Sequence, residues 1–434
     1  MASRKFVTTF VTFIFTTIVT FGSVAGSDDK LDKLVEKVSP SVVERRRDIH
    51  QHPELGNRET RTAGVVAKHL KKLGMKVQTG VAHTGVVGLL EGGRSGPVIA
   101  LRADMDALPV SEQVDLPFVS KVRTMYRGRE VGVMHACGHD AHTAILMGVA
   151  EVLSAMKKDL RGSVKFIFQP AEEGAPEGEE GGAAMMIAEG VLENPAPEVI
   201  FGLHTFPAPP GTVGYRSGGI MASADSFKMR VSGAQTHGAQ PWAGIDPITA
   251  TAQIIQALQL IPSRQVDTTI APVVISIGSI HGGLRSNIIP DHVDVEGTIR
   301  ILDPVLRDGV LQRIRHTVTT IAAASGAKAE ITLLPYAPVT YNDPALVRKM
   351  LPTFQRIAGP GAVEARPVTP AEDFAWMLKE VPGIYFFLGI NDEGVSVNDA
   401  ATNHSPKFYI NEDVLPLGVK TMSALVLDYM KMAQ

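Results

Sequence analysis

The chain has 434 residues, of which 44% are hydrophobic and 20% charged, and its formal net charge at pH 7 is −3. This composition is typical of a soluble α/β protein, and it lacks the basic excess that a nucleic-acid partner would require. The length exceeds what one ordinary core accommodates, so we expect two domains.

The first 26 residues resemble a secretory signal peptide. Arg4 and Lys5 give a charged start, residues 6–21 an apolar middle, and residues 23–26 a cleavage region of small residues. The apolar middle is too short to span a bilayer, and no later segment is long and apolar enough to do so. We therefore expect cleavage near residue 26, no stable membrane anchor, and a secreted or periplasmic protein.

Strand and helix patterns alternate through much of the remaining chain. Helical spacing of apolar residues occurs at 31–38, 65–73, 141–156 and 183–190. Short apolar runs of the kind found in strands covered on both faces occur at 86–90, 98–101, 164–168, 199–203 and 384–390. This alternation predicts an α/β fold, with a mostly parallel sheet flanked by helices.

Residues 225–336 follow a different pattern. Strands are expected at 226–231, 273–280, 293–301 and 329–334, and helices at 246–260 and 304–324. This order predicts an α+β sandwich with one exposed sheet face. Because the strand at 384–390 belongs with the parallel sheet, the sandwich is an insertion, and the first domain comprises residues 27–224 and 337–434.

Ionisable residues follow three of the apolar strands. Asp104 follows the second strand, Glu172 and Glu173 the third, and His204 the fourth. A charge after a single strand is usually a solvated loop residue. Ligands of open α/β sheets bind beyond the carboxyl ends of the strands, so three such strands at one edge predict a site there.

Cys137 is the only cysteine and lies in the run Met-His-Ala-Cys-Gly-His-Asp-Ala-His. A lone cysteine cannot form an intramolecular disulfide, and a free thiol is a liability in an exported protein. A thiolate held by a metal ion is deprotonated and protected. The alternative is a small buried residue in a histidine-rich turn.

Five residues form the candidate metal-ligand set: Cys137, His139, Glu173, His204 and His404. Thiolate, imidazole and carboxylate together suit zinc, with manganese, cobalt or nickel as alternatives. Five ligands are too many for one closed tetrahedral site. They match two metal ions that share a ligand and keep positions open for water.

Glu172 is the candidate general base. Adjacent carboxylates in an extended segment cannot point the same way, so Glu173 can bind metal while Glu172 faces the reacting water. The alternative is a solvated acidic loop, since Glu177, Glu179 and Glu180 follow.

Eight motifs occur along the chain in a fixed order: RADMDALP, MHACGHDAHTA, FQPAEEG, FGLH, SGAQTHGAQPW, SNIIPD, GTIR and NHSPKF. In these motifs the chain resembles the amidohydrolase branch of the aminoacylase/carboxypeptidase-type metallopeptidase family. That branch contains hippurate hydrolases, N-acyl-amino-acid amidohydrolases and indoleacetyl-amino-acid hydrolases. The resemblance extends from about residue 31 to residue 429.

The resemblance implies a role for each candidate residue. Glu172 would be the general base, Cys137 the bridging ligand, and Asp104 a carboxylate that orients a ligand imidazole. The two metal sites would be completed by these pairs: Glu173 with His404, and His139 with His204.

The resemblance also implies that the inserted segment is a lid and dimerisation domain. His237 would reach the active site, often that of the partner subunit, and stabilise the tetrahedral oxyanion. Asn287 and Arg300 would hold the substrate near its carboxylate, a task that suits the arginine fork. Without this resemblance, His237 has the appearance of a surface residue. We expect a homodimer.

The leading functional hypothesis is a dinuclear metal hydrolase that cleaves N-acyl-amino acids to a carboxylic acid and a free amino acid. A dipeptidase or carboxypeptidase would use the same chemistry. An exported metal-binding protein would need the ligands but not Glu172 or His237, and the absence of a G-x-S-x-G elbow disfavours a serine hydrolase. Loops near Met221 and Phe374 are candidates for the acyl pocket.

Overall fold

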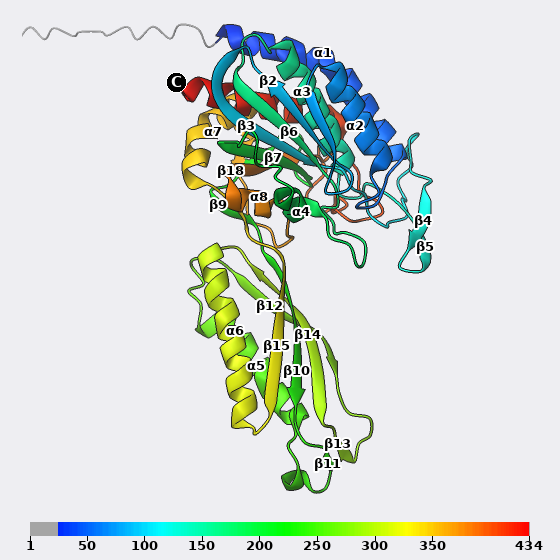
Figure 1. Ribbon diagram of the computed structural model, residues 1–434, viewed down its shortest axis with the longest axis vertical. Helices are drawn as coiled ribbons and strands as arrows, with labels where there is room; N and C mark the ends of the chain where they lie inside the picture. The colour runs from blue at the N-terminus through cyan, green and yellow to red at the C-terminus, as the bar shows by residue number, and fades with distance from the viewer. Residues whose placement is uncertain (1–24, 434) are drawn as a thin grey trace, which may run out of the picture.

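The computed structural model describes residues 25–433, so residues 1–24 of the predicted signal peptide lie outside the described residues. Within 25–433, no helix has the length and apolar character needed to cross a membrane. The chain folds into a large sheet covered by helices and a second, elongated part in which two helices pack on a four-stranded sheet (Figure 1).

The large sheet has a parallel centre. Its eight strands in spatial order are β1 (Lys76–Val81), β2 (Gly85–Glu91), β6 (Arg161–Gln169), β3 (Arg94–Asp104), β7 (Val199–Phe206), β18 (Gly383–Gly389), β8 (Val213–Tyr215) and β17 (Ala362–Glu364). Strands β6, β3, β7 and β18 run parallel to their neighbours in this group. The predicted α/β class with a mostly parallel, helix-flanked sheet is confirmed.

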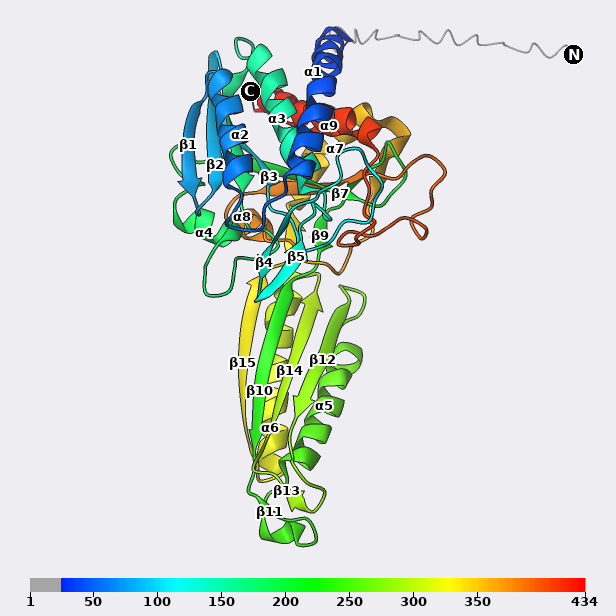
Figure 2. The same ribbon diagram turned by 90° about the vertical axis from the view of Figure 1, so that its right-hand side faces the viewer.

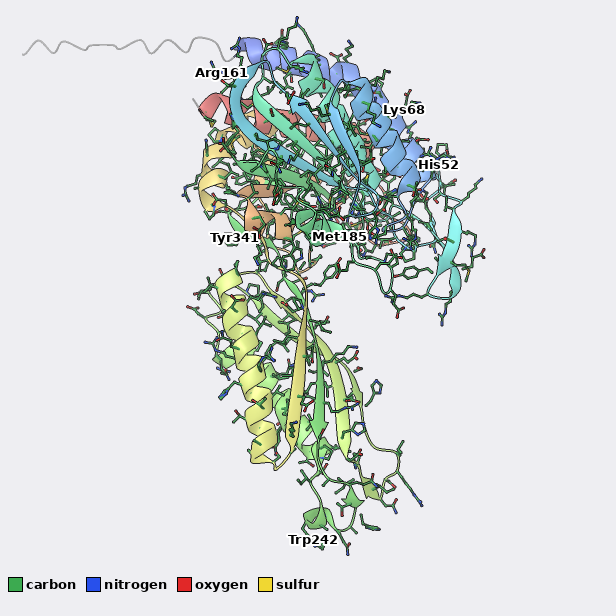
Figure 3. All side chains as sticks on the ribbon, viewed as in Figure 1. His52, Lys68, Arg161, Met185, Trp242 and Tyr341 are labelled. Atoms are coloured by element: carbon green, nitrogen blue, oxygen red, sulfur yellow. The ribbon has the colours of Figure 1, made fainter. Side chains whose placement is uncertain are left out.

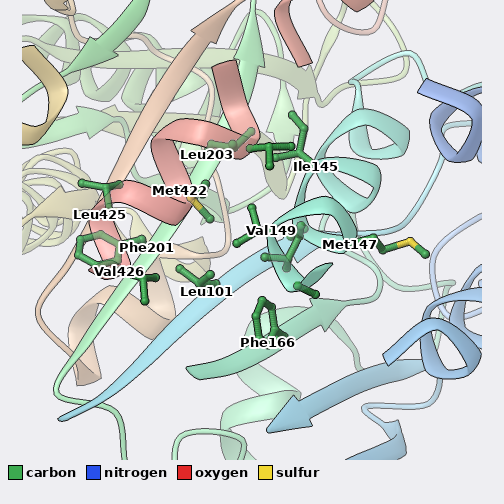
Figure 4. Packing of buried hydrophobic residues seen from close by; sticks show 14 of the residues in the cluster. Leu101, Ile145, Met147, Val149, Phe166, Phe201, Leu203, Met422, Leu425 and Val426 are labelled. Atoms are coloured by element: carbon green, nitrogen blue, oxygen red, sulfur yellow. The ribbon is translucent and has the colours of Figure 1, made fainter. Parts of the chain in front are cut away.

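Helices cover both faces of this sheet. On one face lie α1 (Ala25–Gln51), α2 (Thr60–Lys72), α3 (His139–Ala155), α7 (Pro344–Ala358) and α9 (Leu415–Met432). On the other lie the shorter α4 (Gly182–Ala188) and α8 (Ala375–Glu380). Successive residues of a strand face opposite sides, so Leu101 packs with the first group of helices and Ala100 with the second. Figure 4 shows Leu101 and Phe166 beneath Val149 of α3.

The edge of the sheet differs from the expected pattern. β2 was expected among strands of a parallel sheet, but it runs antiparallel to both β1 and β6. β1 and β2 are joined by a tight turn in which Ala82 and His83 adopt positive φ values of 47° and 75°. A hairpin of this kind can only join antiparallel strands, and apolar periodicity carries no information on strand direction.

The second sheet is antiparallel and covered on one face only. Its strands in order are β12 (Val273–His281), β14 (His292–Ile301), β10 (Ala224–Ser232) and β15 (Lys328–Ala337). In β10, Phe227 and Met229 are buried under the helices, while Lys228 and Arg230 are exposed. Residues 225–336 remain our proposed inserted domain, and the figures show them extending away from the large sheet (Figures 1 and 2).

Two helices cover the buried face of the second sheet, α5 (Pro247–Arg264) and α6 (Pro304–Ala324). Each begins with proline after an aspartate whose carboxylate accepts backbone N–H groups of the first turn, Asp246 for α5 and Asp303 for α6. The fixed φ of proline and the capping carboxylate both favour a helix start at this point.

Three small two-stranded sheets complete the part of the fold between residues 25 and 433: β4 (Arg123–Tyr126) with β5 (Arg129–Gly132), β9 (Gly218–Met221) with β16 (Thr340–Asn342), and β11 (Thr236–His237) with β13 (Ile288–Ile289). Short 3₁₀ turns occur at Pro241–Ala243, Gly359–Gly361 and Glu412–Val414. The β4–β5 hairpin projects from one side of the part that holds the large sheet (Figure 1).

Candidate metal centre

The parallel strands bring ionisable residues to one edge of the large sheet. β3 ends at Asp104, β6 ends three residues before Glu172, and His204 lies near the end of β7. These three strands are neighbours, in the order β6, β3, β7. Their carboxyl ends therefore lie side by side, as expected for the ligand-binding edge of an open α/β sheet.

All five candidate ligands lie in two overlapping groups. Within each group the ligand atoms lie within 4.8 Å of one another, and the groups are Cys137, His139, His204 and Cys137, Glu173, His404. The Cys137 Sγ atom is 3.5 Å from His204 Nε2, and His404 Nε2 is 2.9 Å from Glu173 Oε1. Cys137 is common to both groups, which is the place a bridging ligand would occupy.

Unusual backbone conformations hold the ligand turn in place. Gly138 has φ +93°, and a Cβ atom there would lie 2.2 Å from Thr205 Oγ1. Only glycine adopts this conformation so close to a neighbour, and it lets Cys137 and His139 lie on either side of a sharp helix start. His404 also has a positive φ of 69°, and its backbone N–H donates to Ala136 O at 2.7 Å.

The adjacent glutamates both reach the ligand region, although they were expected to point in different directions. Ala171 before them has φ +51°, and the Glu173 backbone N–H donates to Asp106 Oδ2 at 2.9 Å. Glu172 is buried and Glu173 half-buried, and both offer oxygens within 4.8 Å of His139. The Glu172 Oε2 atom lies 3.9 Å from His139 Nε2. A carboxylate that is not needed as a ligand is thus held beside the ligands.

The electrostatics of this site favour bound cations. Burial, followed by the charges of Glu173 and Glu172, raises the pKa of Cys137 well above its usual value. Burial, followed by Glu372 and Glu173, raises the pKa of Glu172 well above its usual value. A divalent ion would reverse both effects because it stabilises thiolate and carboxylate. His139 Nε2, buried and without a hydrogen-bond partner among the described residues, is a ready ligand atom.

The donor set therefore fits two divalent metal ions. It combines one thiolate, three imidazoles and one carboxylate, which are ligands typical of zinc and related ions. His204 Nδ1 donates to the carbonyl of Thr205 at 2.7 Å, which leaves Nε2 free to bind metal.

The carboxylates behind the ligands differ from the expected arrangement. Asp104 was expected to orient a ligand imidazole, but its Oδ1 lies 2.6 Å from Nδ1 of His142 and 3.8 Å from Nδ1 of His139. Asp106 is closer to His139, at 3.2 Å. His139 and His142 are neighbours on one face of α3, so each imidazole meets a different carboxylate.

A buried charge network at the same edge was not predicted from the sequence. The Arg102 guanidinium is fully buried and donates to Asp104 Oδ2 at 2.7 Å, Glu372 Oε1 at 2.9 Å and Asp373 Oδ1 at 3.1 Å. The Tyr385 hydroxyl donates to the other oxygen of Glu372 at 2.5 Å. An arginine within an apolar strand was the available signal, but its partners 270 and 271 residues away could not be read from it.

The three candidates of the inserted segment do not join the ligand groups of their own chain. His237 lies in β11, and the Gly238 backbone N–H donates to Asn287 O at 2.8 Å, so His237 and Asn287 share the distal tip. Figure 3 shows Trp242 at this tip, and its side chain is 80% exposed. Arg300 lies near the end of β14, eight residues after its first residue His292. At about 3.4 Å per strand residue, Arg300 is about 27 Å from His292 along the strand.

Met221 and Phe374, which marked the loops expected to form the acyl pocket, do not themselves line a pocket. Met221 and Phe374 are buried and belong to the hydrophobic cluster on the α4–α8 face of the sheet, together with Tyr385. Their side chains are packed against other apolar groups and do not line an open site. Hydrophobicity in a loop does not distinguish a core residue from a pocket residue, because both avoid water.

Comparisons with known proteins identify the family. Residues 100–428 match the model of Peptidase family M20/M25/M40. Thermostable carboxypeptidase 2 of Saccharolobus solfataricus is 41% identical over 404 residues, covering 92% of this chain and 98% of that protein. N-acetylcysteine deacetylase of Bacillus subtilis is 36% identical over 388 residues, covering 89% and 96%.

A solved structure is also similar over almost the whole chain. The dinuclear metal binding peptidase YXEP of Bacillus subtilis, from the M20 family, is 34% identical, has a TM-score of 0.76, and is matched over 91% of this chain and 99% of that one. Together with the family match over residues 100–428, this identifies the chain. The chain belongs to Peptidase family M20/M25/M40 and is a metal-dependent hydrolase of amide bonds.

Proposed function

We propose that this protein hydrolyses N-acyl-amino acids, or amino-acid conjugates, to a carboxylic acid and a free amino acid. The observation that carries the proposal is the position of Glu172: it is buried next to the paired ligand groups but is not needed to complete either of them. The N-acetylcysteine deacetylase among the relatives supports an acyl-amino acid as the substrate class.

The residues of the chain divide the work of amide hydrolysis. Two divalent ions at the site would polarise the amide carbonyl and lower the pKa of the attacking water. Glu172 accepts a proton as the water oxygen bonds to the carbonyl carbon. It then donates this proton to the amine nitrogen as the carbon–nitrogen bond breaks. The five ligands keep the reacting groups in place, and Arg102 with its carboxylate partners fixes the loop behind Glu172.

We propose zinc as the native metal, because thiolate, imidazole and carboxylate are its usual protein ligands. Manganese, cobalt and nickel are the alternatives, since related ligand sets also bind them. We further propose a homodimer in which His237 of the partner subunit donates to the oxyanion, and in which Asn287 and Arg300 contact the substrate near its carboxylate. The position of His237 at the distal tip supports this, since its own chain's ligand groups lie elsewhere. Export with removal of the first 26 residues completes the proposal.

The second candidate is a dipeptidase or carboxypeptidase that uses the same centre. The 41% identity to thermostable carboxypeptidase 2 favours it. A substrate panel separates the two candidates: acetyl, benzoyl and indoleacetyl groups on several amino acids, beside unblocked dipeptides. We expect the metal-loaded enzyme to release amino acid from the acylated compounds. A clear preference for dipeptides with a free amino terminus would replace our proposal with the second candidate.

A further inference from the structure

A cavity of about 320 Å³ lies directly beside the metal centre. Glu173, a candidate ligand, and Asp106, which lies 3.2 Å from His139, both line it, so a group inside the cavity can be bonded to an atom at the centre. The remaining wall comes from the turn after α1, the segment after β3, the loop after β6 and the tip of the β4–β5 hairpin.

The wall of this cavity combines apolar and charged side chains. Its larger apolar or aromatic residues are Leu55, Leu108, Pro109, Met125, Tyr126 and Pro176, and its charged residues are Arg58, Asp106, Arg127, Glu173 and Glu177. Both cationic residues have partners: Arg58 forms a two-point ion pair with Glu179, at 2.5 and 3.1 Å, and Arg127 lies over the Tyr126 ring at 5.4 Å. The cavity therefore offers apolar contact beside cationic groups that already have partners.

The hairpin supplies one exposed and one half-buried side chain of the wall, Met125 and Tyr126. Met125 is 65% exposed, so a group bound in the cavity would bury apolar surface that otherwise contacts solvent. β4 and β5 pair only with each other among the described strands, so no third strand fixes the hairpin. A two-stranded hairpin is marginally stable alone, and methionine adapts to irregular shapes, so the tip can close on a bound group.

We propose that this cavity binds the side chain of the acyl group, and that Met125 and Tyr126 determine which acyl groups are accepted. This inference rests on the proposed function. The carbonyl carbon of the scissile amide lies at the metal centre, so the acyl side chain enters the cavity past Asp106 and Glu173. A volume near the lower end of the range for small-molecule sites, about 300–1,000 Å³, suits one compact apolar or aromatic group.

Variants of the hairpin tip test the assignment. Met125→Ala, Tyr126→Ala and the double variant are compared in the metal-loaded enzyme with Thr124→Ala, a control in β4 that does not line the cavity. The measurement is kcat/KM for N-benzoyl- and N-acetyl- forms of the same amino acid. We expect the benzoyl-to-acetyl ratio to fall about tenfold in the double variant, the size of effect that lost apolar pocket contacts produce. Thr124→Ala should keep the wild-type ratio.

Product inhibition gives a second readout that does not need turnover of a poor substrate. The inhibition constant of benzoate, relative to that of acetate, should rise in the tip variants and not in Thr124→Ala. An unchanged ratio for substrates and inhibitors in the double variant would overturn the assignment, while wild-type cleavage of the acylated substrates would leave the proposed function standing. If the wild type cleaved only unblocked dipeptides, the proposed function itself would fail.

Discussion

The backbone N–H of Asp373 donates to a carboxylate oxygen of Glu172 at 3.3 Å, although 201 residues separate the two. Asp373 is in turn tied to Arg102 and Gln169 through its side chain, at 3.1 and 2.6 Å. The candidate base is therefore held by a backbone group on a loop that buried ion pairs keep in place. A residue that must move a proton reproducibly benefits from this kind of support.

Replacing Glu172 by glutamine should keep both metal ions and the fold but remove most turnover. The amide oxygen can still accept the Asp373 N–H, whereas it cannot accept a proton from water. We expect kcat to fall about 10²- to 10⁴-fold. Elemental analysis and kcat on one acylated substrate check this, with the exposed Glu180→Gln as a matched control in the same loop. Near-normal turnover in a metal-replete Glu172→Gln enzyme would remove Glu172 from its assigned role.

Cys137→Ser should lose metal together with activity. A neutral hydroxyl cannot replace a thiolate shared by two cations, and Cys137 belongs to both ligand groups. Cys137→Asp restores an anionic ligand and should recover part of the metal content. Metal stoichiometry after dialysis and the melting temperature with and without added zinc are the measurements. If the Cys137→Ser variant still bound two metal ions tightly, Cys137 would be a small buried residue and not a metal ligand.

Arg102→Met should destabilise the fold strongly. It leaves the buried carboxylates of Asp104, Glu372 and Asp373 without their cation, a change that typically costs about 3–5 kcal/mol. Arg230→Met is the matched control, since Arg230 makes a two-point pair with Asp294 on the exposed sheet face, where a pair contributes about 0–1 kcal/mol. Urea unfolding of the metal-loaded proteins gives both values. Equal losses in the two variants would show that the buried network contributes no more than a surface pair.

His237→Ala should reduce kcat by the equivalent of about 2.7–4 kcal/mol, the effect of losing one oxyanion donor, with metal content unchanged. Because His237 lies at the distal tip, we expect it to act in the partner subunit. Mixing His237→Ala with Glu172→Gln would then give heterodimers with one intact site, and activity should return. If no activity returns although tagged-chain pull-down confirms subunit exchange, the shared site is excluded.

Local sequence patterns were sufficient for most of the secondary structure. The helix expected at residues 304–324 coincides with α6, because proline and the capping Asp303 define its start. The strand expected at 199–203 is the first part of β7, because continuous apolar runs are typical of strands buried on both faces. The direction of β2 was not predictable, since an antiparallel and a parallel strand bury the same apolar side chains.

For the candidate site too, some features could be predicted from the sequence and others depended on the tertiary structure. The sequence by itself determined which residue types are candidate ligands, because a lone cysteine among histidines favours a bound thiolate, and paired glutamates after an apolar strand favour a ligand beside a base. Only the tertiary structure decided that Asp106 rather than Asp104 lies nearest His139, and that Arg102 meets Glu372 across 270 residues. Residue chemistry and periodicity are local properties that a sequence displays directly. Which buried charges meet depends on how distant strands and loops pack, because each desolvated charge must find a partner wherever the fold provides one.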